Sequence, residues 1–323
     1  MTDLSAATAT ADRTEARPLL LVPLDGSRLA EAVLPHVARL ATALDARVLL
    51  LHVLETDAPR EVHGESHLVE ADPAHAYLDG AANRLRESGV VDIEEHVHDN
   101  RERDVAKAIV DHAQEYDARL IVLANHGSGG WREFFFGSIA QQVIRHGRQA
   151  VIAIPVRERL DVGEPLAANR PPGPVALASS AGEGPEPAFT DVAWIAGAYG
   201  VGVHLIAVVE TLGSMSARDR AIASLVPSAS REVLAIQEEE VRMRLSATIA
   251  AFRQAGVEAD GVVLRGDPAE AIVAEATRAG AGLLALATHG HSELTGLWTT
   301  SVGSRVLATY GRPLLLVPDP TPA

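Results

Sequence analysis

The residues best suited to chemistry lie in one stretch of the chain, Leu123–Ser138. A run of branched apolar residues leads into it, and such a run indicates a buried parallel strand. Gly127 and Gly137 lie in the loop, and a helical pattern begins at Ser138. The unpaired N–H groups and positive dipole end of a helix favour an anion, and a glycine backbone can approach that anion closely. The stretch therefore predicts a phosphate-binding loop.

The rest of the first half supplies the strands and helices that would position this loop. Helical patterns alternate with apolar runs, which predicts βαβ units and a mostly parallel sheet. Pro35 is expected to kink the first helix, and residues 56–72 are expected to form a mobile loop. The expected strands are residues 18–24, 46–53, 93–98, 118–123 and 150–155, and the expected helices are residues 28–44, 74–87, 104–116 and 139–146.

The second half repeats the first. Val208 follows Val53 by 155 positions, whereas Gly290 follows Gly127 by 163. The second half therefore has about eight extra residues between Val208 and Gly290, and we assign them to a long helix over 228–253. A repeat of this size predicts two copies of one unit. The predicted fold class is α/β, with two tandem flavodoxin-like domains, each a mostly parallel five-stranded sheet between helices. The expected organisation is a disordered leader at 1–16, a first domain at 17–158, a linker at 159–172 and a second domain at 173–319.

Composition excludes several function classes. With 28 Lys+Arg against 43 Asp+Glu, the net charge is −15, so there is no overall attraction to nucleic acid or an anionic membrane. The chain has no cysteine, which excludes disulfides and thiolate zinc sites. Lys107 is the only lysine and lies in a helical pattern, so no GK[ST] phosphate loop exists. We find no apolar run of membrane-helix length and expect a cytoplasmic protein.

The loop resembles the nucleotide-binding signature of the universal stress protein family. That signature reads G-x-x-G, nine residues, G-S/T, and here Gly127 is followed by nine residues and then Gly137 and Ser138. Ala124 stands at the position of the first glycine, which is tolerated if its φ is negative. The resemblance covers the chain from about Arg17 to Pro318. It implies the adenine nucleotide alpha hydrolase-like form of the fold and ATP as the bound nucleotide.

The resemblance also implies which residues contact ATP in the first half, at the carboxyl ends of the first two strands. Asp25 would accept hydrogen bonds from the nucleoside, and the Val53 backbone would pair with the adenine edge. Alternatively, Asp25 is an ordinary turn residue that caps the first helix, and Gly137-Ser138 is a plain helix N-cap. Mg²⁺ would bridge the phosphates. The other implied contacts are Pro23, Ala124, Asn125, Gly127, Gly137, Ser138 and Ile139.

The second half lacks key groups of this pattern. Ser180 occupies the position of Asp25, and Thr300 occupies that of Gly137. The branched Cβ of threonine crowds the place where a phosphate would approach the helix. We therefore expect about one nucleotide per chain, held by the first half.

Three functions remain open at this point. The first is a nucleotide-dependent regulatory module without catalysis. The second is a slow ATP hydrolase, for which Arg132 is the obvious loop candidate. The third is an ATP-independent structural or signalling scaffold, which Ala124 keeps open. No residue is assigned a catalytic role.

Weaker signals concern a metal and partners. His96 and His98 are two residues apart on a strand, so both point to one face and could chelate a metal beside Glu94, although polar residues on an exposed edge are commoner. His126 and His289 fit a scaffold role better than that of a catalytic base. An aromatic group at 131–136 fits core packing better than a partner surface.

Assembly is inferred from the sheet edges. The last strand of each half is apolar and terminal, and such an edge needs a partner. The two halves are expected to pair through these strands as an internal pseudo-dimer, and two chains are expected to form a homodimer.

Overall fold

The computed structural model describes residues 17–56, 61–62, 65–66, 68–125, 138–156, 173–179, 188–209, 211, 227–288 and 302–318. The elements of the first half are β1 (Leu19–Pro23), α1 (Arg28–Glu31), α2 (Leu34–Leu44), β2 (Arg47–Glu55), β3 (Glu61–Val62), β4 (Glu65–Ser66), α3 (Ala71–Glu87), β5 (Ile93–Glu102), α4 (Val105–Glu115), β6 (Leu120–Asn125), α5 (Ser138–His146) and β7 (Ala150–Pro155). Those of the second half are β8 (Val175–Ala178), α6 (Phe189–Tyr199), β9 (Val203–Val209), α8 (Pro227–Gln254), β10 (Ala259–Arg265), α9 (Pro268–Arg278), β11 (Leu283–Thr288), α10 (Val302–Thr309) and β12 (Leu314–Pro318).

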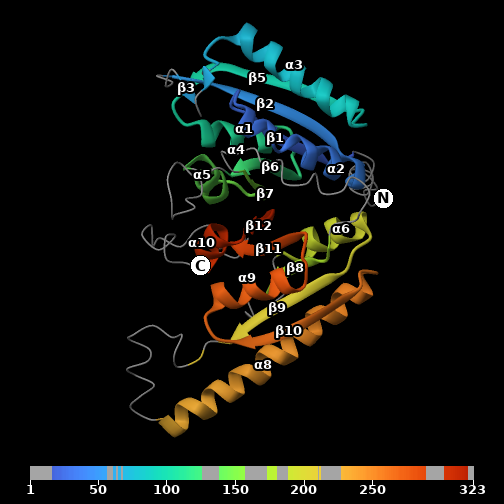
Figure 1. Ribbon diagram of the computed structural model, residues 1–323, viewed down its shortest axis with the longest axis vertical. Helices are drawn as coiled ribbons and strands as arrows, with labels where there is room; N and C mark the ends of the chain where they lie inside the picture. The colour runs from blue at the N-terminus through green and yellow to red at the C-terminus, as the bar shows by residue number, and fades with distance from the viewer. Residues whose placement is uncertain are drawn as a thin grey trace, which may run out of the picture.

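One ten-stranded sheet runs through both halves, in the order β10-β9-β8-β11-β12-β7-β6-β1-β2-β5. Each half contributes five parallel strands, with its first strand in the middle of its own set. This confirms the predicted α/β fold with two tandem copies. The strands lie one beside another along the long axis of the molecule, with β5 near one end and β10 near the other (Figure 1).

Two layers of helices cover the sheet because the strands of its interior are apolar on both faces. In β1, Leu20 and Val22 pack into one cluster while Leu19 and Leu21 pack into the other. The first cluster includes side chains of α1, α2, α3, α6 and α8, and the second includes side chains of α4, α5, α9 and α10. Because full burial of one such side chain contributes about 1.5–3 kcal/mol, these clusters hold the helices against the two faces of the sheet.

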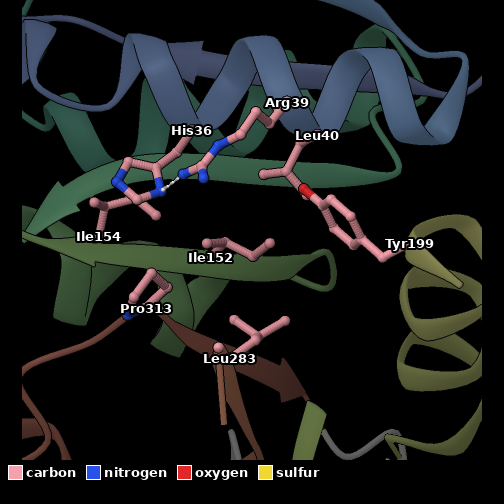
Figure 2. Close-up of a pocket in the computed structure, with 9 residues that line it drawn as sticks. His36, Arg39, Leu40, Ile152, Ile154, Tyr199, Leu283 and Pro313 are labelled. Atoms are coloured by element: carbon pink, nitrogen blue, oxygen red, sulfur yellow. Dashed lines mark hydrogen bonds between the residues drawn. The ribbon is translucent and has the colours of Figure 1, made fainter. Parts of the chain in front are cut away.

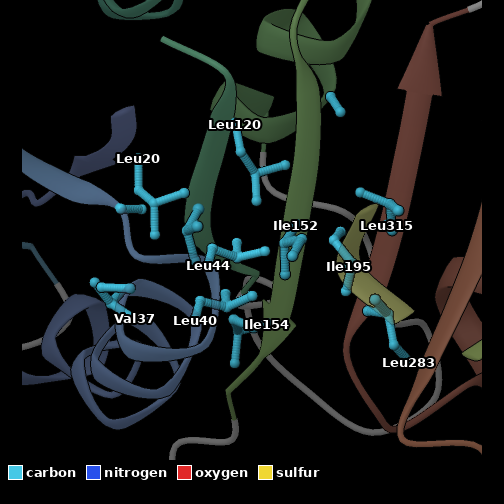
Figure 3. Close-up of a cluster of buried hydrophobic side chains, with 14 of the residues drawn as sticks. Leu20, Val37, Leu40, Leu44, Leu120, Ile152, Ile154, Ile195, Leu283 and Leu315 are labelled. Atoms are coloured by element: carbon cyan, nitrogen blue, oxygen red, sulfur yellow. The ribbon is translucent and has the colours of Figure 1, made fainter. Parts of the chain in front are cut away.

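The two halves meet at a seam where β7 and β12 pair antiparallel, as the sequence predicts. Ile152 lies opposite Leu315 in register, and both side chains are buried. Figure 3 shows the apolar cluster continuing across this seam, from Leu20 to Leu315. Around it, the Arg119 guanidinium lies 2.6 Å from the carboxylate of Asp191 on α6. The exposed apolar edge of each half is thereby covered within the chain.

Two local predictions are corrected by the structure. The expected single helix over 28–44 is two helices, because α1 ends at Glu31 and α2 begins at Leu34. Pro35 lies in the first turn of α2, where its missing N–H costs no hydrogen bond, so it starts a helix and does not kink one. The expected loop over 56–72 contains the short β3–β4 hairpin, and α3 begins within it at Ala71.

Candidate functional site

The predicted contacts that the structure describes lie at one edge of the first five strands. Pro23 is the last residue of β1, Val53 lies near the end of β2, and Ala124 and Asn125 end β6. β1 pairs with β2 on one side and β6 on the other, so it is the switch point of the sheet. Parallel sheets bind ligands beyond the carboxyl ends of their strands at such a point. The fold therefore brings these four residues to the expected edge.

The backbone of Val53 faces the space beyond the end of β1. In a parallel ladder, alternate residues direct their N–H and C=O groups toward opposite neighbours. Leu51 faces β1, because its carbonyl accepts a hydrogen bond from the Leu24 N–H at 2.9 Å. Val53 is two residues further on and faces the same side, but β1 ends at Pro23, which lies opposite Leu51. The Val53 backbone is therefore aimed where the flat edge of a base could pair with it.

Asp25 is held in a turn directly after β1. Its Oδ1 accepts hydrogen bonds from the Ser27 N–H at 2.9 Å and from the Ser27 hydroxyl at 2.6 Å. Ser27 Oγ in turn accepts from the Ala30 N–H at 3.1 Å and caps α1. The helix cap is therefore Ser27, and Asp25 orients that cap.

A buried histidine, His52, contacts the backbone on either side of this turn. His52 is 1% exposed, its Nδ1 lies 2.7 Å from the Leu24 carbonyl oxygen, and its Nε2 lies 3.2 Å from the Leu68 carbonyl oxygen. Gly26 has φ +92°, and a Cβ at that position would lie 2.9 Å from the Leu68 side chain. His52 was not among the predicted contacts. Its signal was a single polar residue inside the apolar run of β2.

Ala124 fits the signature position without backbone strain. It lies inside β6 opposite Ile154, and it is not among the described non-glycine residues with positive φ, which are Asp45 and Asp117. In extended backbone, alanine adds only a methyl group relative to glycine. Asn125, which follows it, is 8% exposed, and its carbonyl accepts the Val156 N–H at 3.0 Å.

The helix side of the loop is described only from its start. Ser138 is the first residue of α5, one residue before the expected start at Ile139, and Ile139 is exposed beside it. Gly127 and Gly137 lie outside the described residues, as do Arg132, the two loop histidines and the aromatic group at 131–136. Their roles stay predictions. Lys107 is exposed and pairs with Asp111 one turn along α4, as expected for a solvated helix face.

The second half repeats the backbone frame of the site. The Ser179 N–H donates to the Ile206 carbonyl at 2.9 Å, and these residues lie 155 positions after Leu24 and Leu51. Val208 therefore faces the space beyond β8, just as Val53 faces the space beyond β1. The described backbone at these strand ends therefore does not distinguish the two halves. Ser180 and Thr300, which distinguish the halves in the sequence, lie outside the described residues.

A small cavity lies at the seam and contains none of the predicted contacts. It measures about 60 Å³, which is room for a few water molecules and not for a nucleotide. His36, Arg39 and Leu40 line it from α2, and Tyr199 lines it from α6 (Figure 2). His36 Nδ1 lies 3.1 Å from an Arg39 nitrogen, and burial, together with the Arg39 charge, lowers the pKa of His36 to about 4.

At the equivalent place on the other side of the seam, an ion pair stands where this cavity lies. α2 and α6 match residue for residue with an offset of 155, so Asp191 corresponds to His36. Arg119 corresponds to Gly282, which lies 163 positions later and lines the cavity. Arg119 and Asp191 form an ion pair, whereas the equivalent Gly282 has no side chain to meet His36. The seam is therefore nearly two-fold in backbone and asymmetric in charge.

A second hollow, of about 430 Å³, lies at the amino ends of β9 and β10. His204, Arg253, Asp260 and Arg278 line it. These groups are engaged with one another and with the backbone: Arg253 donates to the Ala259 carbonyl at 2.7 Å, and His204 Nδ1 lies 2.5 Å from Asp260. Within its own half, the hollow lies at the opposite end of the strands from Val208.

Comparison with known proteins identifies the family. A sequence profile of the universal stress protein family matches residues 19–155 and 174–318, so the chain belongs to that family and carries two copies of its domain. A curated universal stress protein of Synechocystis sp. is 26% identical over 151 residues, which is 42% of this chain and 96% of the relative.

A solved structure that matches nearly the whole chain agrees with this fold. A protein of unknown function from Pseudomonas aeruginosa covers 95% of this chain and 95% of its own, with a TM-score of 0.63 and 16% identity. A universal stress protein from Archaeoglobus fulgidus, solved in complex with dAMP, is 26% identical, covers 44% of this chain and 98% of its own, and has a TM-score of 0.33. Among the described residues, no helix has the length and apolar character needed to cross a membrane.

Proposed function

We propose that this protein is an adenine-nucleotide-binding regulatory module of the stress response, which holds ATP in its first half. The observation that carries the proposal is the pairing of two features at one edge of the sheet. The Val53 backbone faces the space beyond β1, and the Asp25 turn lies beside that space. Family membership supplies the stress-response context.

The adenine would lie against the carboxyl ends of β1 and β2. The Val53 N–H and C=O would pair with its donor and acceptor edge, and Pro23 would pack against its face. Asp25 would accept hydrogen bonds from the ribose hydroxyls, held in place by Ser27. A carboxylate that accepts from a neutral donor contributes about 1.5–3 kcal/mol, so one such contact is worth roughly 10-fold or more in affinity.

The phosphates would lie at the start of α5. Its first N–H groups and the Ser138 hydroxyl would bind phosphate oxygens, with the backbone at Gly127 and Gly137 close to them. Ala124, Asn125 and Ile139 would border the ribose and phosphates. Mg²⁺ would be held chiefly by the phosphate oxygens and water, as is common for this ion.

Calorimetric titration of the full chain with ATP and Mg²⁺ tests this proposal. We expect one site per chain, and we expect Asp25→Asn to weaken it about 10-fold or more. Asp79→Asn is the matched control, because Asp79 is exposed on α3 and carries the same charge. Equal affinities of the two variants would contradict the assignment of Asp25.

The same samples separate the two alternative functions. Release of ADP over time, lost in Arg132→Ala with binding retained, would favour the slow hydrolase. No heat of binding for ATP, ADP or AMP would favour the ATP-independent scaffold. Either result would replace the regulatory module as the preferred function.

A homodimer also stays a proposal. The β7 and β12 edges pair within one chain, so two chains would have to associate through another surface. Among the described strands, the sheet ends at β5, which is rich in charged residues, and at β10. Such charges oppose edge-to-edge pairing, so we expect any dimer to use helices. Light scattering at the mass of one chain would reject the dimer.

A further inference from the structure

Three histidines converge on one face of the sheet edge formed by β5. His96 and His98 are two residues apart on this strand and share a face. α4 packs on that face and contributes His112, which is 8% exposed. One ring nitrogen from each histidine lies within 4.8 Å of the other two. The sequence could indicate the first two residues, but only the packing of α4 against β5 supplies the third.

Hydrogen bonds orient these rings toward one another. His112 Nδ1 lies 3.1 Å from a Glu115 carboxylate oxygen, so this nitrogen carries the proton and Nε2 has the lone pair. His98 Nδ1 lies 3.0 Å from that Nε2. His96 Nδ1 lies 3.4 Å from the Tyr116 hydroxyl. A histidine whose outer nitrogen donates to a carboxylate while its inner nitrogen faces other imidazoles has the arrangement of a metal ligand.

One atom of the cluster has no partner when no metal is bound. If His98 Nδ1 donates to His112, the proton is on Nδ1 and His98 Nε2 is a bare acceptor. That Nε2 is buried and makes no hydrogen bond. A Glu102 carboxylate oxygen lies 3.6 Å from this Nε2, and it cannot donate a hydrogen bond when ionised. A buried polar atom without a partner costs about 1–3 kcal/mol and calls for an explanation.

A metal ion would change which nitrogen of His98 carries the proton. With a cation on His98 Nδ1, the proton moves to Nε2 and faces the Glu102 carboxylate. We propose that His96, His98 and His112 bind a divalent transition-metal ion of the zinc type. Metal–nitrogen bonds of about 2.0–2.1 Å in a tetrahedral site place ligand atoms roughly 3.4 Å apart, which lies between the 3.0 Å and 4.8 Å separations here. Water or a carboxylate would take the fourth position.

The ligand set selects the ion. Imidazole nitrogens suit Zn²⁺, Cu²⁺ and Ni²⁺, whereas Mg²⁺ and Ca²⁺ prefer oxygen ligands. Glu94 is not the third ligand that its position beside His96 suggests, because it pairs with Arg47 at 2.9 Å.

The site is separate from the nucleotide proposal and can be tested alone. A tag-free full chain, stripped with EDTA and dialysed, is titrated with ZnCl₂ in competition with a chromogenic chelator. We expect one zinc ion to bind per chain through the three histidines. His112→Asn should weaken this binding by about 100-fold or more. His146→Asn, which removes an exposed histidine on α5, is the matched control and should bind as the parent does.

Two further measurements guard against misfolding of the buried variant. Glu115→Gln keeps all three imidazoles and removes only the carboxylate behind His112, so binding should weaken about 10–100-fold. Co²⁺ bound to the parent chain should give the visible absorption of a tetrahedral site, and His98→Asn should abolish it. Absence of bound zinc in the parent, or equal zinc affinity in His112→Asn, Glu115→Gln and His146→Asn, would overturn the proposal.

Discussion

The seam between the halves should make the protein sensitive to acid through one residue, His36. Its Nδ1 lies 3.1 Å from a nitrogen of the Arg39 guanidinium, which can only donate hydrogen bonds. Nδ1 must therefore be an unprotonated acceptor in the folded chain. Protonation would break this hydrogen bond and place two cations side by side in a half-buried site. Burial and, to a lesser extent, Arg39 lower the pKa of His36 from 6.5 to about 4.

The sign and size of the effect follow from linkage. As the pH falls through 6.5, the unfolded chain binds a proton at His36 while the folded chain does not, so the free energy of unfolding decreases. The loss ends near pH 4, where the folded chain also takes up the proton. At about 1.36 kcal/mol for each pKa unit, the difference amounts to at most roughly 3 kcal/mol. Above pH 6.5 the residue contributes no pH dependence.

Urea unfolding of the parent and of His36→Gln, measured at steps between pH 7.5 and 4, isolates this contribution. Other titrating groups affect both proteins and cancel in the difference. We expect the parent to lose up to about 3 kcal/mol relative to the variant across this interval. His75→Gln, an exposed change on α3, should follow the parent. A difference between parent and His36→Gln that stays constant from pH 7.5 to 4 would refute the reasoning.

Three other substitutions test the packing that positions the site. Ile152→Ala at the seam should lower the free energy of unfolding by about 2–5 kcal/mol, measured in urea. Gly26→Ala should lower the free energy of unfolding by about 1–2 kcal/mol, because Gly26 has a φ of +92° and the added methyl group would clash with Leu68. Calorimetry should also show that this variant binds ATP more weakly. The Arg278 hydrogen bond lowers the pKa of Glu275 to about 2, so Glu275→Gln should cost about 1–3 kcal/mol at pH 7. This last deficit should vanish as the pH falls from 4.5 toward 2, and a deficit that persists at pH 2 would contradict it.

The sequence predicted the architecture because the repeat and the strand pattern are both strong. Equivalent residues of the two halves are 155 positions apart before α8 and 163 positions apart after it. These two separations located the strands of the second half and showed that the extra residues lie in α8. The apolar terminal strands predicted the pairing of β7 with β12. The break before Pro35 was missed because proline is compatible both with a kink and with a first helical turn, and only the packing of α1 and α2 decides between them.

The positions of the proposed contacts in the fold could be predicted where they depend on chain order, and not where they depend on packing. Ala124 could be placed from the signature alone, and its extended backbone agrees with the substitution. His52 and His112 could not be assigned, because each acts through contacts with segments far away in the chain. No spacing rule in the sequence links a strand histidine to a carbonyl of the following loop, or His98 to His112. These contacts form only when the elements pack.

The most direct test of the account is a crystal structure of the full chain grown with ATP and Mg²⁺. We expect a nucleotide at the carboxyl ends of β1 and β2, with the base paired to the Val53 backbone and the ribose beside Asp25. We expect no nucleotide beside Val208 in the second half. A nucleotide found only beside Val208, or bound equally in both halves, would contradict this expectation.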